Sequence, residues 1–347
     1  MPPEVIKIVQ KMQQNSRVIG QGKPIISTEF QDRRAVAVGG ELLVGHWKTF
    51  HDFLVYYCKR LFSTWGDEEL KKPENEQHTI LRWYRSLCHL QKMNPPKNGE
   101  VIGAPCTGPV AAFMLLAYNL YTLAHNRLLQ KRLIARLKNP DQFQGALYEM
   151  YVAAVFIRAG FEIEFENEDD PTTSHCEYIA TYKQDGQKFS VEAKSKHRAG
   201  IMGYQGERQT PEEIKLNIWR QLNSAVKKHA EFPRVVFIDV NMPPEIVKIS
   251  ETSKLPETSW FNELFQSIEK EENHFLKKGG VLPPAYLFIT NNPLDWVDNS
   301  QLQPSIGFFS TGFGMEDFKK QSLDKEKHKH YLKLIDALNA QGIPVDF

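Results

Sequence analysis

The chain has 347 residues, of which 41% are hydrophobic and 24% are charged, and its formal net charge is +1. This composition is typical of a soluble globular protein of one to three domains. No run of eighteen apolar residues occurs, and the first residues, "MPPEVIKIVQKMQQ", resemble an amphipathic helix and not a signal peptide, so neither a membrane span nor export is expected. Four cysteines without a C-x-x-C pair predict no zinc site and no disulfide framework, which fits the cytoplasm.

The charge is unevenly distributed along the chain. Residues 1–139 contain 20 Lys and Arg against 11 Asp and Glu (+9), whereas residues 140–347 contain 23 against 31 (−8). Such a split indicates a basic N-terminal part that could bind a polyanion. Part of the excess lies on one predicted helix, residues 127–138, and charge runs of this kind are often only solvated surfaces.

Residues 1–139 are predicted to form a mainly helical domain. Apolar residues recur at helical spacing in three segments, 43–62, 78–90 and 109–138. A short hairpin with a Gly-Gly turn is predicted near residue 40, in "AVAVGGELLV".

A different order of elements begins at residue 140. A helix is predicted to start with Asn139 as its N-cap and Pro140 in its first position, and to end at Gly160. Strands are then predicted at 161–166, 176–182, 188–195, 234–240 and 285–290. Helices are predicted between and after the later strands, at 210–230, 259–278 and 328–338. This order predicts an α/β domain over residues 140–347, with a mixed β-sheet flanked by helices.

One Glu-x-Lys tripeptide, "EAK" at residues 192–194, is predicted to lie on a strand. Its two charged side chains, Glu192 and Lys194, therefore project from the same face. The three other Glu/Asp-x-Lys tripeptides of the chain lie in predicted helices or loops, where residues two apart do not face each other. A two-residue turn at Asp185-Gly186 would set Glu177 opposite Lys194, so three charges are expected to converge on one face.

Glu149 is the one charged side chain between Gln142 and Ile157 on the preceding apolar helix. A buried carboxylate normally has a partner or a metal. Glu149 is therefore interpreted either as a fourth member of the site or as the partner of a basic side chain such as Arg158, and the first interpretation is preferred.

Three carboxylates and a lysine, without a His or Cys cluster, suit Mg²⁺ or Mn²⁺, which prefer hard oxygen ligands. Such an ion polarises a phosphodiester, activates a water and offsets charge on the leaving oxygen. Lys194 would orient or help deprotonate the attacking water and stabilise the transition-state charge. The chemistry predicted is the hydrolysis of nucleic acid.

These residues resemble the PD-(D/E)xK nuclease superfamily, the fold shared by type II restriction enzymes, Holliday-junction resolvases and RecB-like nucleases. The resemblance covers residues 140–295, where Glu149 matches the acid of the first helix, Glu177 the acid at the start of the second strand, and "EAK" the signature of the third. It implies a restriction-endonuclease-like mixed β-sheet flanked by helices, here preceded by a mainly α-helical, basic N-terminal domain.

The resemblance also implies an activity, that of a Mg²⁺-dependent endonuclease that cleaves DNA in preference to RNA, in defence or repair. Glu177, Glu192 and the Ala193 carbonyl would bind the metal, Glu149 would ligate it or a bound water, and Gln221 on the next helix would support the site. A homodimer or a complex with a partner protein is expected, and no association with a membrane is expected. The sequence departs from the superfamily at Glu177, where aspartate is usual, and at Cys176, where proline is usual. Asp169 and Asp170 are alternative candidates for the acid of the second strand, and they rank below Glu177.

Several features allow more than one interpretation. Lys196 and Arg198 would either contact phosphates or belong to a solvated strand exit, with equal weight. The rival functions are a non-catalytic nucleic-acid-binding or assembly module of the same fold, and a component of a larger defence complex that a partner activates. Other conspicuous residues are predicted to be structural: His51, Asp52, Cys106, His328 and His330.

Overall fold

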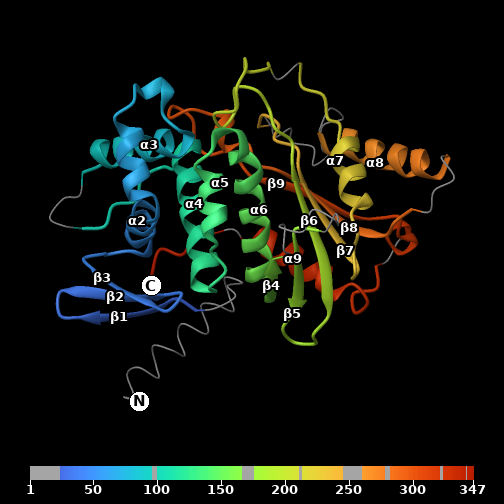
Figure 1. Ribbon diagram of the computed structural model, residues 1–347, viewed down its shortest axis with the longest axis horizontal. Helices are drawn as coiled ribbons and strands as arrows, with labels where there is room; N and C mark the ends of the chain where they lie inside the picture. Colours follow the sequence, from blue (N-terminus) through green and yellow to red (C-terminus); the bar gives the residue numbers. More distant parts are fainter. Residues whose placement is uncertain are drawn as a thin grey trace, which may run out of the picture. The chain divides into compact units, whose positions relative to one another are not determined.

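Figure 1 shows the computed structural model of the chain, which describes residues 24–95, 100–165, 176–210, 213–244, 260–277, 282–320, 323–340 and 342–347. The chain divides into two compact units. The first comprises Met1–Ile163, Val297–Gln303 and Lys333–Phe347, and the second comprises Glu164–Trp296 and Pro304–Leu332. The amphipathic helix expected at residues 1–14 and the substitute acids Asp169 and Asp170 lie outside the described residues.

The first unit contains a three-stranded antiparallel sheet of β1 (Ile26–Phe30), β2 (Arg33–Val38) and β3 (Glu41–Gly45). Gly39 and Gly40 connect β2 to β3 with φ angles of 61° and 104°. Glycine adopts such angles readily, and two of them in succession match the twist of a tight hairpin. The predicted hairpin is confirmed, whereas β1 is not predicted.

Among the described residues of the first unit, five helices follow β3. They are α2 (Phe50–Leu70), α3 (Thr79–Met93), α4 (Gly108–His125), α5 (Lys131–Leu137) and α6 (Pro140–Arg158). Four of them, α2 to α5, lie within residues 1–139, the part predicted to be mainly helical. Nearly every side chain of α4 is buried, because α2, α3 and α6 pack around it. The apolar segment 109–138 forms two helices and not one, because the chain turns at Arg127, whose φ is 60°.

Helix α6 begins and ends as its sequence predicts. Asn139 is the N-cap, and its side chain accepts a hydrogen bond from the backbone N–H of Asp141 at 2.9 Å. Pro140 occupies the first helical position, and Gly160 follows the helix with a φ of 92°. Because α6 packs on α4 and α5, it belongs to the first unit, and the division falls after Ile163 instead of at residue 139.

The second unit is built on a six-stranded mixed sheet with the order β4-β5-β6-β7-β8-β9. The strands of this sheet are β4 (Phe161–Phe165), β5 (Tyr178–Tyr182), β6 (Lys188–Ser195), β7 (Arg234–Asp239), β8 (Ala285–Asn291) and β9 (Gly307–Phe313). The boundary between the units, after Ile163, falls within β4. Strands β5 and β6 are antiparallel, β6, β7 and β8 are parallel, and β9 is antiparallel to β8. The α/β class with a mixed sheet is confirmed, and β9 is an addition that the sequence does not predict.

Helices cover both faces of this sheet; they are α7 (Trp219–Lys227), α8 (Trp260–Lys277) and α9 (Lys329–Asn339). Leu222 of α7 and Leu264 of α8 share one buried cluster with Leu287 of β8. The next residue of β8, Phe288, points to the opposite face, where its ring lies 5.2 Å from that of Tyr331 of α9. Short 3₁₀ helices cover Glu74–Glu76, Leu294–Trp296 and Glu316–Lys319.

Candidate active site

The pairing of β5 with β6 brings Glu177 and Glu192 together. Tyr178 lies opposite Val191, and the N–H of Glu177 donates to the Val191 carbonyl at 2.9 Å, so Glu177 comes next to Glu192 across the strands. The predicted register, with Glu177 opposite Lys194, is wrong by two residues. A shift of two residues leaves every side chain on its face, so the predicted convergence survives.

The loop between these strands explains the different register. The N–H of Tyr182 donates to the Gln187 carbonyl at 2.8 Å, so the loop contains four residues, Lys183 to Gly186, and not two. Gly186 has a φ of 72°, and the Asp185 side chain accepts from the N–H of Gln187 at 3.0 Å. The Asp-Gly pair therefore closes a longer loop instead of forming its centre.

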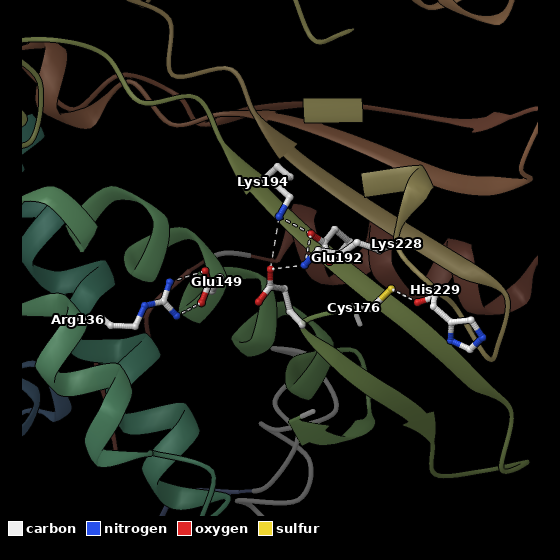
Figure 2. Close-up of polar contacts among 8 residues, drawn as sticks. Arg136, Glu149, Cys176, Glu192, Lys194, Lys228 and His229 are labelled. Atoms are coloured by element: carbon white, nitrogen blue, oxygen red, sulfur yellow. Dashed lines mark hydrogen bonds and ion pairs between the residues drawn. The ribbon is translucent and has the colours of Figure 1, made fainter. Parts of the chain in front are cut away.

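Two lysines face the two carboxylates (Figure 2). Lys194 Nζ forms an ion pair with Glu192 Oε1 and lies 3.6 Å from Glu177 Oε1. Lys228 Nζ lies 2.9 Å from Glu192 Oε1 and 3.3 Å from Glu177 Oε1. We refer to Glu177, Glu192, Lys194 and Lys228 as the charged quartet; all four belong to the second unit.

Burial dominates the electrostatics of the quartet. The Glu192 side chain is 1% exposed, and its burial, together with the nearby carboxylate of Glu177, raises its pKa to about 7 even though both ammonium groups oppose the shift. Burial lowers the pKa of Lys228, but the two carboxylates outweigh it and the net shift is upward. Within the described residues, Glu192 Oε2 is buried without a hydrogen-bond partner.

Lys228 is the member of the quartet that the sequence does not predict. It caps the C-terminus of α7 with an extended backbone, and its carbonyl accepts from the Arg234 side chain at 2.8 Å. The only signal in the sequence is its place near the end of the helix that follows the "EAK" strand. Lys227 beside it shares that position but is exposed, so the pattern alone does not distinguish them.

Glu149 lies on α6 in the first unit and is paired. Its two carboxylate oxygens accept from the guanidinium of Arg136 on α5 at 2.5 and 2.6 Å (Figure 2). This bidentate geometry is a strong form of ion pair. The alternative that Glu149 has a basic partner is confirmed, with Arg136 in the place of Arg158, which instead donates to Asn119 Oδ1 at 3.0 Å. The role of Glu149 as a metal ligand stays a prediction.

The residues predicted to contact substrate differ in exposure. Arg198 is buried and donates to the backbone carbonyls of Asn241 and Val240 at 2.6 and 3.1 Å, so it anchors the strand exit, and its contact with phosphate stays a prediction. Lys196 is half-buried, and burial followed by the charge of Arg198 lowers its pKa. Gln221 is half-buried on α7.

Two further expectations concern residues of the sheet and the last helix. Ala193 is buried on β6 opposite Phe237 of β7, and the role of its carbonyl as a ligand stays a prediction. His328, predicted to be structural, is buried, and its Nδ1 lies 2.9 Å from the Tyr286 hydroxyl. Asp52 is structural as predicted, because it forms a capping box with Thr49 at the start of α2.

The donor set of the quartet can be compared with what a metal requires. Among the described residues, no group of three or more His, Cys, Asp and Glu is placed to hold a metal ion. Mg²⁺ commonly binds through one or two carboxylates and completes its shell with water and substrate oxygens. Glu177 and Glu192 supply two carboxylates, and Glu192 Oε2 is a buried oxygen without a hydrogen-bond partner in the described part of the chain. The pair therefore fits a minimal site for a hard divalent cation.

Comparison with known proteins adds no relative. No protein family, curated protein or solved structure matches this chain. In the described part of the chain, no helix combines the length and the apolarity needed to span a membrane.

Proposed function

We propose that the second unit is a metal-dependent nuclease that hydrolyses phosphodiester bonds of nucleic acid, with DNA favoured over RNA. The observation that carries the proposal is the convergence of Glu177, Glu192 and Lys194 on one face of the β5–β6 pair. A divalent cation bound there would supply Lewis-acid activation of water and of the leaving oxygen.

The topology supports a restriction-endonuclease-like assignment. An antiparallel pair, β5 and β6, is followed by α7 and by a strand, β7, parallel to β6. The "EAK" residues thus lie on a central strand that is antiparallel to one neighbour and parallel to the other. The resemblance to PD-(D/E)xK nucleases implies a mixed β-sheet flanked by helices, and this sheet is mixed and extends to β8 and β9.

Each charged side chain has a role in the proposal. Glu177 and Glu192 would hold the cation, because carboxylates are the protein ligands that Mg²⁺ and Mn²⁺ prefer. Lys194 would orient the attacking water and stabilise negative charge in the transition state. Lys194 is suited to this task because β6 fixes its backbone while its side chain remains 24% exposed. Glu149 has no necessary role in this mechanism, since it already pairs with Arg136.

A second candidate function is favoured by the balance of charge. When both glutamates are ionised, two carboxylates face two ammonium groups, so the quartet is neutral without any metal. A closed set of ion pairs of this kind is also what a non-catalytic nucleic-acid-binding or assembly module would retain. A component that cleaves only with a partner, or as a homodimer, would have the same quartet.

The test is cleavage by the full chain with Mg²⁺ or Mn²⁺ on single- and double-stranded DNA and on RNA. Glu192→Ala and Lys194→Ala are each expected to lower cleavage by at least about a hundredfold. Lys227→Ala, which removes an exposed lysine beside the quartet, should leave the rate unchanged. Circular dichroism and thermal unfolding report whether each variant is folded.

Full activity of either quartet variant would refute the nuclease. Wild-type protein that cleaves nothing and binds no Mn²⁺ would favour the non-catalytic module. Protein that is inert alone but cleaves after addition of a cell extract, with the Lys194→Ala variant inert in the same extract, would identify partner activation.

A further inference from the structure

Lys228 bridges the two carboxylates of the proposed metal site. Its Nζ lies 2.9 Å from Glu192 and 3.3 Å from Glu177, and both contacts are to Oε1 atoms. A single cation between two carboxylates is the arrangement that a divalent metal would also require. Lys194 differs, since it pairs closely with Glu192 and lies 3.6 Å from Glu177.

We propose that Lys228 competes with the divalent cation for Glu177 and Glu192, so that the metal binds only when the Lys228 side chain moves aside. This inference rests on the proposed function and assigns Lys228 a regulatory role in the same site. Lys228 thereby lowers the affinity of the free protein for metal without taking part in the hydrolysis.

The local structure allows the side chain to move while the backbone stays in place. Lys228 follows the last residue of α7, and its N–H bonds to the Ala225 carbonyl at 3.4 Å. Its own carbonyl accepts from Arg234 at 2.8 Å. The side chain is 20% exposed and therefore has access to solvent. A lysine has a flexible four-carbon stem, so its ammonium can leave the carboxylates without unwinding the helix.

The net charge of the quartet determines how strongly Lys228 lowers the affinity of the site for a divalent cation. With Lys194 and Lys228 in place, the two carboxylates are neutralised, and the site attracts a divalent cation weakly. When both glutamates are ionised, removal of the Lys228 charge leaves a net charge of −1 around the buried Glu192. Two unit charges a few ångströms apart near a protein surface interact strongly, so the change in metal affinity should be large.

The experiment is a calorimetric titration of the full chain with Mn²⁺ in the absence of nucleic acid. Lys228→Gln keeps the length of the side chain and removes its charge, and it is expected to bind Mn²⁺ at least about tenfold more tightly than the wild type. Lys228→Arg keeps the charge and should bind no more tightly than the wild type. Lys227→Gln is the matched control for loss of an exposed neighbouring charge and should change nothing.

The outcomes separate this inference from the function on which it rests. Wild-type binding of Mn²⁺ with equal or weaker binding by Lys228→Gln would overturn the competition and leave the metal site intact. Binding by neither protein would overturn both. Tighter binding by Lys228→Gln but not by Lys228→Arg would establish Lys228 as the competitor, whether or not cleavage is measured.

Discussion

Three buried or half-buried carboxylates, those of Glu149, Glu192 and Asp239, form ion pairs or hydrogen bonds with identified side chains and backbone groups. These contacts predict the effects of substitutions on stability. Glu149 and Arg136 join α6 to α5 through two hydrogen bonds, with side chains 18% and 24% exposed. Glu192 is nearly inaccessible and depends on two ammonium groups. Asp239, at the end of β7, is buried and accepts hydrogen bonds from the Thr290 hydroxyl and the Asn292 N–H at 3.2 and 3.3 Å.

The Glu149–Arg136 pair predicts a measurable coupling. In a double-mutant cycle of Glu149→Ala and Arg136→Ala, we expect a coupling energy of about 1–2 kcal/mol, because the pair is bidentate and mostly shielded from water. Urea unfolding measures it. Lys131→Ala, an exposed residue of the same helix, serves as the control partner and should show no coupling to Glu149. A coupling near zero for Arg136 would mean that the pair contributes nothing to stability.

Asp239 predicts a dependence of stability on pH. Burial raises its pKa from 3.8 to about 7, despite the hydrogen bonds that favour the charged form. The folded state therefore holds a proton that the unfolded state releases above about pH 4, so stability from this group is present at low pH and is lost as the pH rises to about 7.

We expect Asp239→Asn to gain stability relative to the wild type between pH 4 and pH 8, by at most about 4 kcal/mol. Unfolding free energies at both pH values measure the difference. Asp336→Asn, at an exposed position, is the control for the loss of a carboxylate that is not buried. A difference between Asp239→Asn and the wild type that is independent of pH would contradict the raised pKa.

At the scale of elements, the sequence was sufficient to predict a helix start or a turn where the backbone conformation requires a particular residue type. Asn139 and Pro140 mark the start of α6, and Gly39 with Gly40 marks the β2–β3 turn. The β5–β6 register was not predictable, because an Asp-Gly pair is compatible with loops of two or four residues. Strands β1 and β9 lack a clear alternation of apolar residues in "ISTEF" and "GFFSTGF".

The hairpin turn predicts a large effect for a small substitution. A Cβ atom at Gly39 would lie 2.6 Å from the Ala124 carbonyl oxygen, at a φ of 61°. Gly39→Ala should therefore lower the free energy of unfolding by at least about 2 kcal/mol. A Cβ atom at Gly103 would have no atom within 4 Å, so Gly103→Ala should change the free energy of unfolding by less than about 0.5 kcal/mol. Equal stability of the two variants in thermal or urea unfolding would show that the turn tolerates a side chain.

At the scale of the whole molecule, the sequence predicted the α/β class and the face shared by Glu177, Glu192 and Lys194. It did not predict Lys228, because that residue is distant in the chain and is brought to the site by the packing of α7 on β6 and β7. It also did not predict that α6 belongs with the helices before it, since helix packing depends on partners that a local pattern does not identify.

The uneven charge predicts how nucleic acid should bind. If the basic residues 1–139 contact phosphates, affinity for labelled DNA should fall steeply between about 50 and 200 mM salt. Replacing the exposed Lys131 and Arg132 with glutamine should make the dependence on salt less steep. Fluorescence anisotropy measures both. If no binding occurs at low salt, or if salt does not change the affinity, then residues 1–139 do not bind nucleic acid through its phosphates.

The most direct test of the metal-dependent nuclease is a crystal structure of the protein grown with Mn²⁺, with anomalous scattering recorded at the manganese absorption edge. We predict an anomalous peak between the Glu177 and Glu192 carboxylates, with the Lys228 ammonium displaced from them. The absence of a peak at saturating Mn²⁺, with both lysines still paired to the carboxylates, would contradict the account.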